Sequence, residues 1–374
     1  MHITCSKDDL MTNINIVSKA VSVKSTLPIL ECILLSVDDN GFRMTSNDLE
    51  LAIQTSYIKS DVTKTGSIAL ESRMFSEIIK KLPDQEVIIY TDEANMTFIK
   101  SGKAEFRILG QNSNEFPSLP AVEKNDEYTL SSNEFRNMIK QTIFSISATE
   151  SKPTLTGELI EIENGSLNVV AVDSFRVSFR VAHIATEKPN RSVIVPGKSL
   201  NELSKILPTI DDSELSLYFT EKHILFETDN CIVISRLLEG EFLKYKQIFT
   251  DDYTTIIYAN KQEILASLER SSLISKDSNK IPIKLKIEDD TLIITSNSET
   301  GRSYEEMPIE MDGNMLEVAF NPKYLIDAIK VIDTEKISIQ FTTPLSPCII
   351  KGHKSDLYKY LILPLRLNVG ENNE

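Results

Sequence analysis

The stretch SVIVPGKSLNELSKILP, residues Ser192 to Pro208, decides how the chain is organised. Its β-branched run, Val193-Ile194-Val195, predicts a short strand, and Pro196-Gly197-Lys198 predicts a turn. The spacing of the next apolar residues predicts a helix with one buried face: Leu200, Leu203, Ile206 and Leu207. The stretch therefore reads as one strand-turn-helix unit.

The same unit occurs six times along the chain. When each helix is anchored on its first large apolar residue, neighbouring anchors are 60 or 65 residues apart. The anchors are Leu10, Phe75, Phe135, Leu200, Leu265 and Leu325. Each helix is followed by β-rich runs with turn signals between them, which is typical of hairpins. The repeat predicts an α+β protein of three similar domains, each made of two strand-helix-hairpin units. We place the domains at residues 1–122, 123–251 and 252–374.

A basic column runs along the helix faces opposite the apolar stripes. Five residues past each anchor, at about 140° around the helix, the chain has Asn15, Lys80, Lys140, Lys205, Arg270 and Lys330. Lysine is common on any solvated helix face, so the column by itself also fits a merely soluble surface. The whole chain is acidic, with a formal net charge of −15, so basic residues are its minority charge. Their recurrence at one position favours a functional basic surface.

Composition limits the class of protein. A chain of 374 residues with 41% hydrophobic content has room for two or three well-packed domains. No run of 18 apolar residues occurs and the N-terminus has no signal-peptide pattern, so we expect a cytoplasmic protein without a membrane span. The four cysteines are far apart in sequence, which fits a reduced protein without disulfides.

Motifs for catalysis and metal binding are weak or missing. Gly197-Lys198-Ser199 resembles the end of a phosphate-binding loop, but Ser192 stands where that motif requires a glycine. The four histidines are isolated, and no metal-binding histidine and cysteine cluster is present. We therefore expect no enzyme activity, no cofactor and no metal.

Five stretches of the chain resemble the bacterial sliding clamps, the DNA polymerase III beta subunit family. They are 26–30 (TLPIL), 116–120 (FPSLP), 193–198 (VIVPGK), 235–242 (SRLLEGEF) and 363–367 (LPLRL). With the threefold repeat and the length, the resemblance covers nearly the whole chain. It implies the DNA clamp fold, in which two chains form a head-to-tail ring with the helices lining it. It also implies a processivity factor that encircles duplex DNA without reading its sequence and tethers the replicative polymerase. A clamp loader opens such rings onto DNA.

The resemblance extends to individual residues. It assigns DNA contacts to Lys24, Arg73, Lys152 and Lys198, beside the column residues Lys80, Lys140, Lys205, Arg270 and Lys330. Family members often carry tyrosines after the basic residue that matches Lys152, where this chain has Pro153 and Thr154. For the dimer contact it suggests Phe106, Leu273 and Ile274, for which core packing is an equal explanation.

The family also has a groove that binds short apolar peptides of partner proteins. The residues that match it are Leu155, Val172, Ser174, Phe175, Arg176, Val177, Leu243, Leu345, Leu361, Leu363, Pro364, Leu365 and Arg366. Family members usually have threonine, glycine and histidine where this chain has Val172, Ser174 and Phe175.

Two other hypotheses stay open on the sequence alone. One is a repeat-built protein scaffold that binds no nucleic acid, and the other is an enzyme with an unrecognised site.

Overall fold

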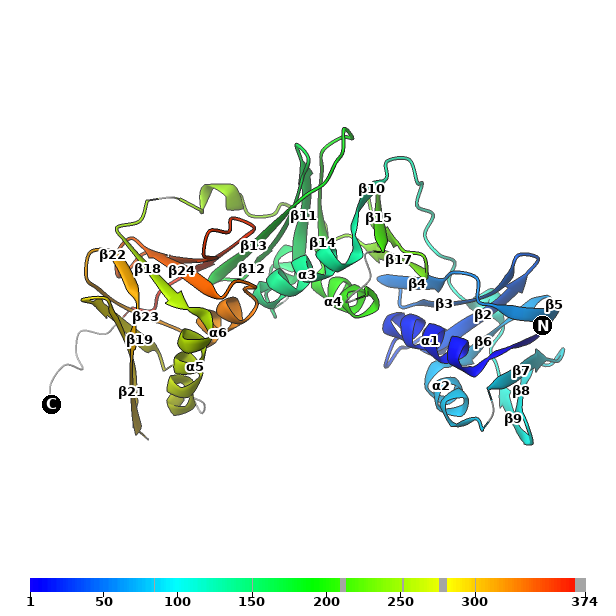
Figure 1. Cartoon of the computed structure of the whole chain (residues 1–374). Helices are drawn as coiled ribbons and strands as arrows, with labels where there is room; N and C mark the ends of the chain where they lie inside the picture. Colours follow the sequence, from blue (N-terminus) through cyan, green and yellow to red (C-terminus); the bar gives the residue numbers. More distant parts are fainter. Residues whose placement is uncertain are drawn as a thin grey trace. The chain divides into compact units, whose positions relative to one another are not determined.

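The computed structural model describes residues 1–83, 85–149, 151–208, 213–250, 252–275, 281–299 and 301–366. Residue Leu367 of the last family-like stretch lies outside the described residues. The chain forms two compact units, the first made of Met1–Arg136 with Lys198–Leu237 and the second of Asn137–Gly197 with Leu238–Glu374. Each unit therefore combines segments that are far apart in the sequence (Figure 1).

Six α-helices lie in the described part of the chain, one in each predicted repeat. They are α1 (Lys7–Val17), α2 (Ser72–Lys81), α3 (Ser132–Thr142), α4 (Gly197–Ile206), α5 (Lys261–Ser272) and α6 (Pro322–Lys330). Polar residues cap several of them; Ser6 at α1 and Asn260 at α5 accept hydrogen bonds from backbone N–H groups of the first turn. Inside the first unit α1 contacts α2, and inside the second α5 contacts α6.

The first unit contains two antiparallel sheets. One has the order β5 (Ser60–Lys64), β1 (His2–Ser6), β7 (Glu86–Thr91), β8 (Met96–Ser101) and β9 (Ala104–Leu109). The other has the order β10 (Tyr128–Ser131), β15 (Glu214–Phe219), β16 (His223–Glu227), β17 (Cys231–Arg236), β4 (Leu51–Thr55), β3 (Gly41–Asn47), β2 (Cys32–Asp38) and β6 (Gly66–Glu71). Leu10, Ile14 and Phe75 of the helices are fully buried in this unit.

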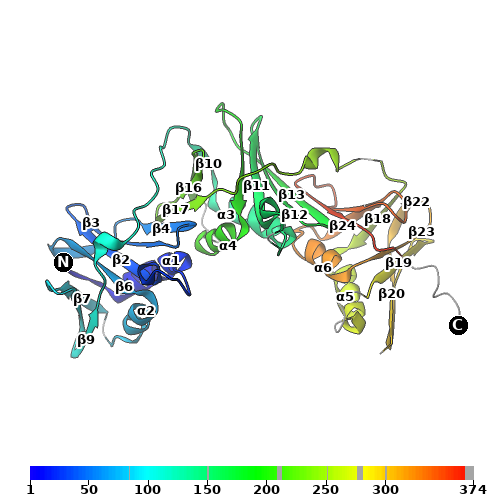
Figure 2. The same ribbon diagram turned by 180° about the vertical axis from the view of Figure 1, so that it is seen from behind.

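The second unit also contains two antiparallel sheets. The larger has the order β14 (Arg191–Pro196), β11 (Gly157–Glu163), β12 (Ser166–Val172), β13 (Arg176–His183), β26 (Tyr358–Ile362), β25 (Cys348–Gly352), β24 (Lys336–Phe341), β18 (Thr255–Asn260) and β22 (Glu310–Gly313). The smaller has the order β21 (Gly301–Pro308), β20 (Thr291–Ser298), β19 (Ile283–Glu288) and β23 (Leu316–Phe320). Helix α5 packs on β18, β20 and β21 (Figure 2), and its Leu268 shares a buried cluster with Leu285 and Leu325.

Two strand pairs join segments that the repeat assigns to different domains. Strand β4 pairs with β17, and β13 pairs with β26. Both pairs have the same register, since the first residue of one strand faces the fifth of the other: Leu51 faces Ser235, and Arg176 faces Ile362. Backbone hydrogen bonds thus carry each large sheet from one predicted domain into the next.

One buried acid in the second unit lacks a charge partner. Glu158 on β11 is fully buried, and neither carboxylate oxygen accepts a hydrogen bond among the described residues. The Thr142 hydroxyl lies against it but donates to the Met138 carbonyl at 2.8 Å. Burial raises the pKa of Glu158 to about 8, because the charged form would lose its hydration.

We predict that Glu158 makes the protein less stable as pH rises from about 4.5 to about 8. The folded chain keeps this carboxyl protonated in that window, whereas the unfolded chain releases the proton, so the free energy of unfolding falls by up to about 1.4 kcal/mol per pH unit. Below about 4.5 both states hold the proton, and above about 8 neither does. Urea unfolding of wild type and Glu158→Gln across pH 4–9 measures the difference. An equal pH dependence in both proteins contradicts the prediction.

Candidate functional site

The six helices bury the same position of their first turn. The residue three positions after the first helical residue is Leu10, Phe75, Phe135, Leu200, Ile264 or Leu325, and each is fully or almost fully buried. Five of the six predicted anchors are therefore confirmed. The prediction for the fifth helix is wrong by one residue, because Ile264 is buried and Leu265 is only half-buried. With Ile264 as anchor, the outward position five residues on is Glu269 and not Arg270.

The predicted basic residues are all exposed. Asn15, Lys80, Lys140, Lys205, Arg270 and Lys330 lie on the solvent side of their helices, and Lys24, Arg73, Lys152 and Lys198 are exposed as well. Among the described residues, five of the basic side chains make no ion pair or hydrogen bond: Lys24, Arg73, Lys80, Lys152 and Lys330. Their charges are available to an external anion.

Three of the basic residues already have acidic partners. Lys198 Nζ lies 2.7 Å from the buried Asp48 carboxylate, and this hydrogen bond raises the pKa of Lys198. Lys205 pairs with Glu202 one turn earlier at 2.6 Å. Arg270 pairs with Glu305 of β21 at 2.6 Å, which ties it to the neighbouring sheet. These pairs weaken the local positive potential, so the six helices do not present equal charge.

The turn Gly197-Lys198-Ser199, which lacks the first glycine of a phosphate-binding loop, has a packing role. Gly197 begins α4 at a place where a Cβ atom would collide with the Ile146 side chain. The Lys198 side chain is held by Asp48.

Among the described residues, no group of three or more His, Cys, Asp or Glu is arranged to hold a metal ion. None of the described helices is both long and apolar enough to cross a membrane.

Arg176 organises the segment that was assigned to the peptide groove. Its side chain is buried, with Nε 3.0 Å from Asp173 and Nη1 2.8 Å from Asp327 of α6. Nη2 donates to the Phe144 carbonyl, and the guanidinium lies 4.5 Å from the ring centre of Tyr324. The charge is thus compensated on several sides, as a buried arginine requires. The ion pair also fastens the end of β13 to α6.

The other groove residues form an apolar cluster that reaches the surface. Val172, Val177 and Leu361 are buried in one core cluster, and Leu155 packs against it half-buried. The remaining predicted groove positions are exposed, namely Ser174, Phe175, Leu243, Leu345, Leu363 and Arg366, or half-buried, namely Pro364 and Leu365. Core packing therefore explains the buried residues, whereas the exposed residues form an accessible surface.

Two backbone hydrogen bonds fix the strap from Leu363 to Leu365 beside this cluster. Leu363 N–H donates to the Phe175 carbonyl at 2.9 Å, and Leu365 N–H donates to the Ala319 carbonyl at 2.8 Å. The Phe175 ring stacks on Tyr324 with ring centres 5.9 Å apart. Phe175 therefore adds an exposed aromatic face to this surface.

The residues suggested for a dimer contact lie on an edge strand or in a 3₁₀ helix packed against one. Phe106 is on β9 and is 37% exposed, while Leu273 is 54% exposed and Ile274 half-buried in the short 3₁₀ helix Leu273–Ser275. That 3₁₀ helix contacts β20 and β21. In the described part of the chain, β9 and β21 each pair with one neighbour only, so each leaves one backbone edge unpaired. The apolar pattern of the sequence predicts neither strand.

We predict that Arg176→Ala destabilises the second unit by about 3–5 kcal/mol, because it leaves Asp173 and Asp327 close together without their shared cation. Urea unfolding at pH 7 measures the loss. The control is Arg191→Ala, a half-buried arginine at the start of β14, which we expect to cost about 1 kcal/mol or less. A loss for Arg176→Ala as small as that of the control contradicts the role of Arg176 as an organiser.

Comparisons with known proteins cover almost the whole chain. Models of the DNA polymerase III beta subunit match at residues 1–120 (N-terminal domain), 129–244 (central domain) and 246–366 (C-terminal domain). The beta sliding clamp of Bacillus subtilis is 35% identical, over 98% of this chain and 100% of the relative. The crystal structure of the Bacillus subtilis sliding clamp superposes with a TM-score of 0.95 at 34% identity, over 98% of this chain and 100% of that one. A putative DNA polymerase III beta subunit from Eubacterium rectale gives a TM-score of 0.94 at 40% identity, with the same coverage. The chain therefore belongs to the DNA polymerase III beta subunit family, the bacterial beta sliding clamps.

Proposed function

We propose that this chain is a DNA sliding clamp. Two copies close into a ring around duplex DNA, and the ring tethers a replicative polymerase so that synthesis becomes processive. It acts in the cytoplasm of a bacterium and has no catalytic site of its own. The proposal rests on the open backbone edges of two strands, β9 and β21. These edges are of the same two kinds as the edges that already pair inside the chain.

The match follows from the order of the strands. Strands β9, β17 and β26 each end a meander that begins with the first strand of a proposed domain: β1-β7-β8-β9, β10-β15-β16-β17 and β18-β24-β25-β26. Strands β4, β13 and β21 each end the complementary meander: β6-β2-β3-β4, β14-β11-β12-β13 and β23-β19-β20-β21. The pairs β4–β17 and β13–β26 join the two kinds of meander. The third pair, β21 with β9, is the one left to form.

A second copy supplies that third pair. If β21 of one copy joins β9 of the other in the register of the two internal junctions, Gly301 faces Ile108 and Ser303 faces Phe106. Leu273 and Ile274 then lie beside the junction, because their 3₁₀ helix contacts β21. The arrangement is head to tail, so two copies form two identical junctions and close the ring. The three domains that this scheme requires are those proposed at residues 1–122, 123–251 and 252–374.

The charge distribution suits a ring that slides. The uncompensated cations Arg73, Lys80 and Lys330 belong to helices, and such side chains attract phosphates without reading bases. The acidic remainder of the chain, with net charge −15, discourages DNA from binding elsewhere. Because closure of the ring retains the DNA, individual contacts have no need to be strong, and weak contacts permit sliding.

The proposed ring also predicts which partners the protein binds. A closed ring needs a clamp loader that opens it onto DNA, and the apolar surface around Leu155, Leu243, Leu345 and Leu363 suits short apolar peptides from the polymerase and other partners. Lys24, Lys140, Lys152, Lys198, Lys205 and Arg270 complete the proposed DNA-facing set. For Lys198, Lys205 and Arg270, the acidic partners reduce the expected contribution.

We predict that the double variant Phe106→Lys with Leu273→Lys separates the ring into monomers. Lysines at the junction remove apolar contact and add like charges, which raises the dissociation constant at least about tenfold. Sedimentation at low micromolar concentration should give about twice 42.1 kDa for wild type and 42.1 kDa for the variant. The matched control, Val62→Lys with Leu357→Lys, replaces exposed apolar residues away from the junction and should remain dimeric. A monomeric wild type contradicts the ring.

We predict that charge reversal at Lys80, Lys140, Lys205 and Lys330 to glutamate abolishes salt-dependent association with duplex DNA. Each phosphate contact contributes about 0.9 to the slope of log affinity against log salt concentration, so losing the contacts flattens that slope. Fluorescence anisotropy with a short labelled duplex at 20–200 mM salt measures it. The control reverses four exposed lysines off the helices, Lys59, Lys64, Lys222 and Lys354, with the same change in net charge. Equal binding by both variants favours the scaffold without nucleic acid.

A further inference from the structure

Strand β5 of the first unit has an open backbone edge, whereas the equivalent edge in the second unit is capped. Strands β5 and β22 hold the same place, because each pairs antiparallel with the strand that precedes α1 or α5. At β22, Ile309 N–H donates to the Asp290 carbonyl at 2.9 Å, and Met311 N–H donates to Asp290 Oδ1 at 3.0 Å. The matching turn of the first unit, between β2 and β3, has Asn40 in place of Asp290 and caps no amide of β5.

The strand registers show which amides of β5 are left open. Val62 faces Ile3 of β1, three residues before the N-cap of α1. Met311 faces Ile257 of β18, three residues before the N-cap of α5. Val62 thus holds the place of Met311, so the N–H groups of Val62 and Ser60 point away from β1. On that side, in the described part of the chain, they meet no acceptor.

The open edge is short and accessible. Strand β5 ends its sheet (Figure 1), and its residues from Asp61 to Lys64 are exposed. A bulge between His2 and Ile3 interrupts the ladder after Val62, so the regular edge is limited to Ser60–Val62. Unpaired edge groups of this kind can accept an added strand.

An acidic cavity of about 390 Å³ lies at the same end of β5. Beside β5 it is lined by Thr4, Cys5 and Ser6 of β1, Asp9 of α1, and the 85–86 segment at the start of β7. The carboxylates of Asp9, Asp61 and Glu86 make no ion pair or hydrogen bond with the described residues. Lys59 is the one cation in the lining. The cavity therefore has room for a side chain and complements a positive charge.

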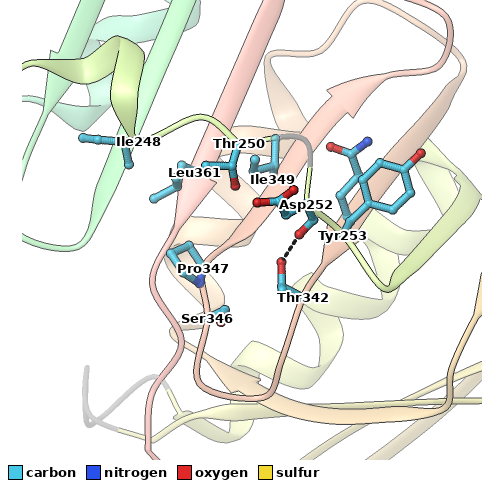
Figure 3. Close-up of a pocket in the computed structure, with 10 residues that line it drawn as sticks. Ile248, Thr250, Asp252, Tyr253, Thr342, Ser346, Pro347, Ile349 and Leu361 are labelled. Carbon is cyan, nitrogen blue, oxygen red and sulfur yellow. Dashed lines mark hydrogen bonds between the residues drawn. The ribbon is translucent and has the colours of Figure 1, made fainter.

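The cavity at β5 shares no residue with the proposed peptide surface. That surface belongs to the second unit, where another cavity has walls from Ile349 and Leu361 (Figure 3). Both residues are part of the core cluster beneath the groove. The β5 site thus depends neither on the groove nor on the ring.

We propose that β5 binds an extended basic segment of a partner protein. The segment lies beside Ser60–Val62, where the outward N–H and C=O groups pair with its backbone. An arginine or lysine of the segment enters the cavity, where Asp9, Asp61 and Glu86 supply the negative charge. The charge of the lining favours a basic segment over a neutral or acidic one.

Amide NMR of the full chain tests this proposal with three peptides. The first is acetyl-Val-Thr-Arg-Thr-Val-amide, the second has citrulline in place of arginine, and the third carries N-methyl groups on two adjacent residues, one of which must face β5. We expect the first peptide to shift the amide signals of Ser60 and Val62 saturably and to slow their hydrogen exchange at least about tenfold. It should bind at least about fivefold more tightly than either of the others. The amide of Ile108, on the open edge of β9, should not shift.

Two double variants separate charge recognition from strand pairing. Asp61→Asn with Glu86→Gln should remove the preference for arginine over citrulline. The matched control, Glu93→Gln with Glu221→Gln, neutralises two exposed acids elsewhere in the first unit and should keep that preference. An equal loss of preference in both variants shows a general charge effect and overturns the site.

The remaining outcomes also decide the proposal. Missing saturable shifts at Ser60 and Val62, equal binding of the citrulline or N-methyl peptide, or shifts at Ile108 alone overturns it. Without peptide, amides of Ser60 and Val62 that are already protected in a particle heavier than two chains show that another copy covers β5, which overturns it as well. Sedimentation of the β5 variants should match wild type, so failure of the ring and failure of the β5 site are separate results.

Discussion

The open strand edge is the constraint on which the rest of the structure depends. A strand at a sheet edge leaves backbone N–H and C=O groups unpaired, and another strand of matching direction can add to it. Within this chain the edges of β4 and β13 are covered by β17 and β26, in one common register. Strands β9 and β21 keep edges of the same two kinds. Assembly thus extends the strand pairing that already builds each unit, and the proposed ring needs no new type of contact.

The helices follow from the sheets, since each buries an apolar stripe and leaves the opposite side to solvent. That side carries exposed cations on five of the helices, α2 to α6, but their charges are not equally compensated. Lys80 and Lys330 are uncompensated, whereas Lys205 has Glu202 and Arg270 has Glu305. Surface pairs of this kind are worth little energy, yet they lower the local potential. For a ring that must slide, a partly neutralised surface is an advantage, because strong contacts at every helix would slow movement along DNA.

The sequence predicted the helices well because each has a buried residue at one fixed position. The error at Leu265 arose because α5 buries Ser267 and Ser271 beside Ile264 and Leu268, so apolar spacing alone does not define its face. Strands β9 (AEFRIL) and β21 (GRSYEEMP) escaped prediction because their charged residues hide the apolar alternation that identifies a strand. The β4–β17 and β13–β26 pairs join distant segments, which local patterns do not specify. The ion pair of Lys198 with Asp48 was not predicted, because it also joins residues that are far apart in the sequence.

The proposed peptide surface shows why core packing and binding need not be alternatives for its residues. Val172, Val177 and Leu361 are buried and stabilise the unit, while Leu243, Leu345 and Leu363 are exposed. Arg176 connects the two sets, since its ion pairs with Asp173 and Asp327 hold the end of β13 against α6. Leu363 is in turn hydrogen-bonded to Phe175, the residue before Arg176. A buried charge that is expensive to desolvate thereby fixes an apolar surface in one conformation, which lowers the entropy that a bound peptide must overcome.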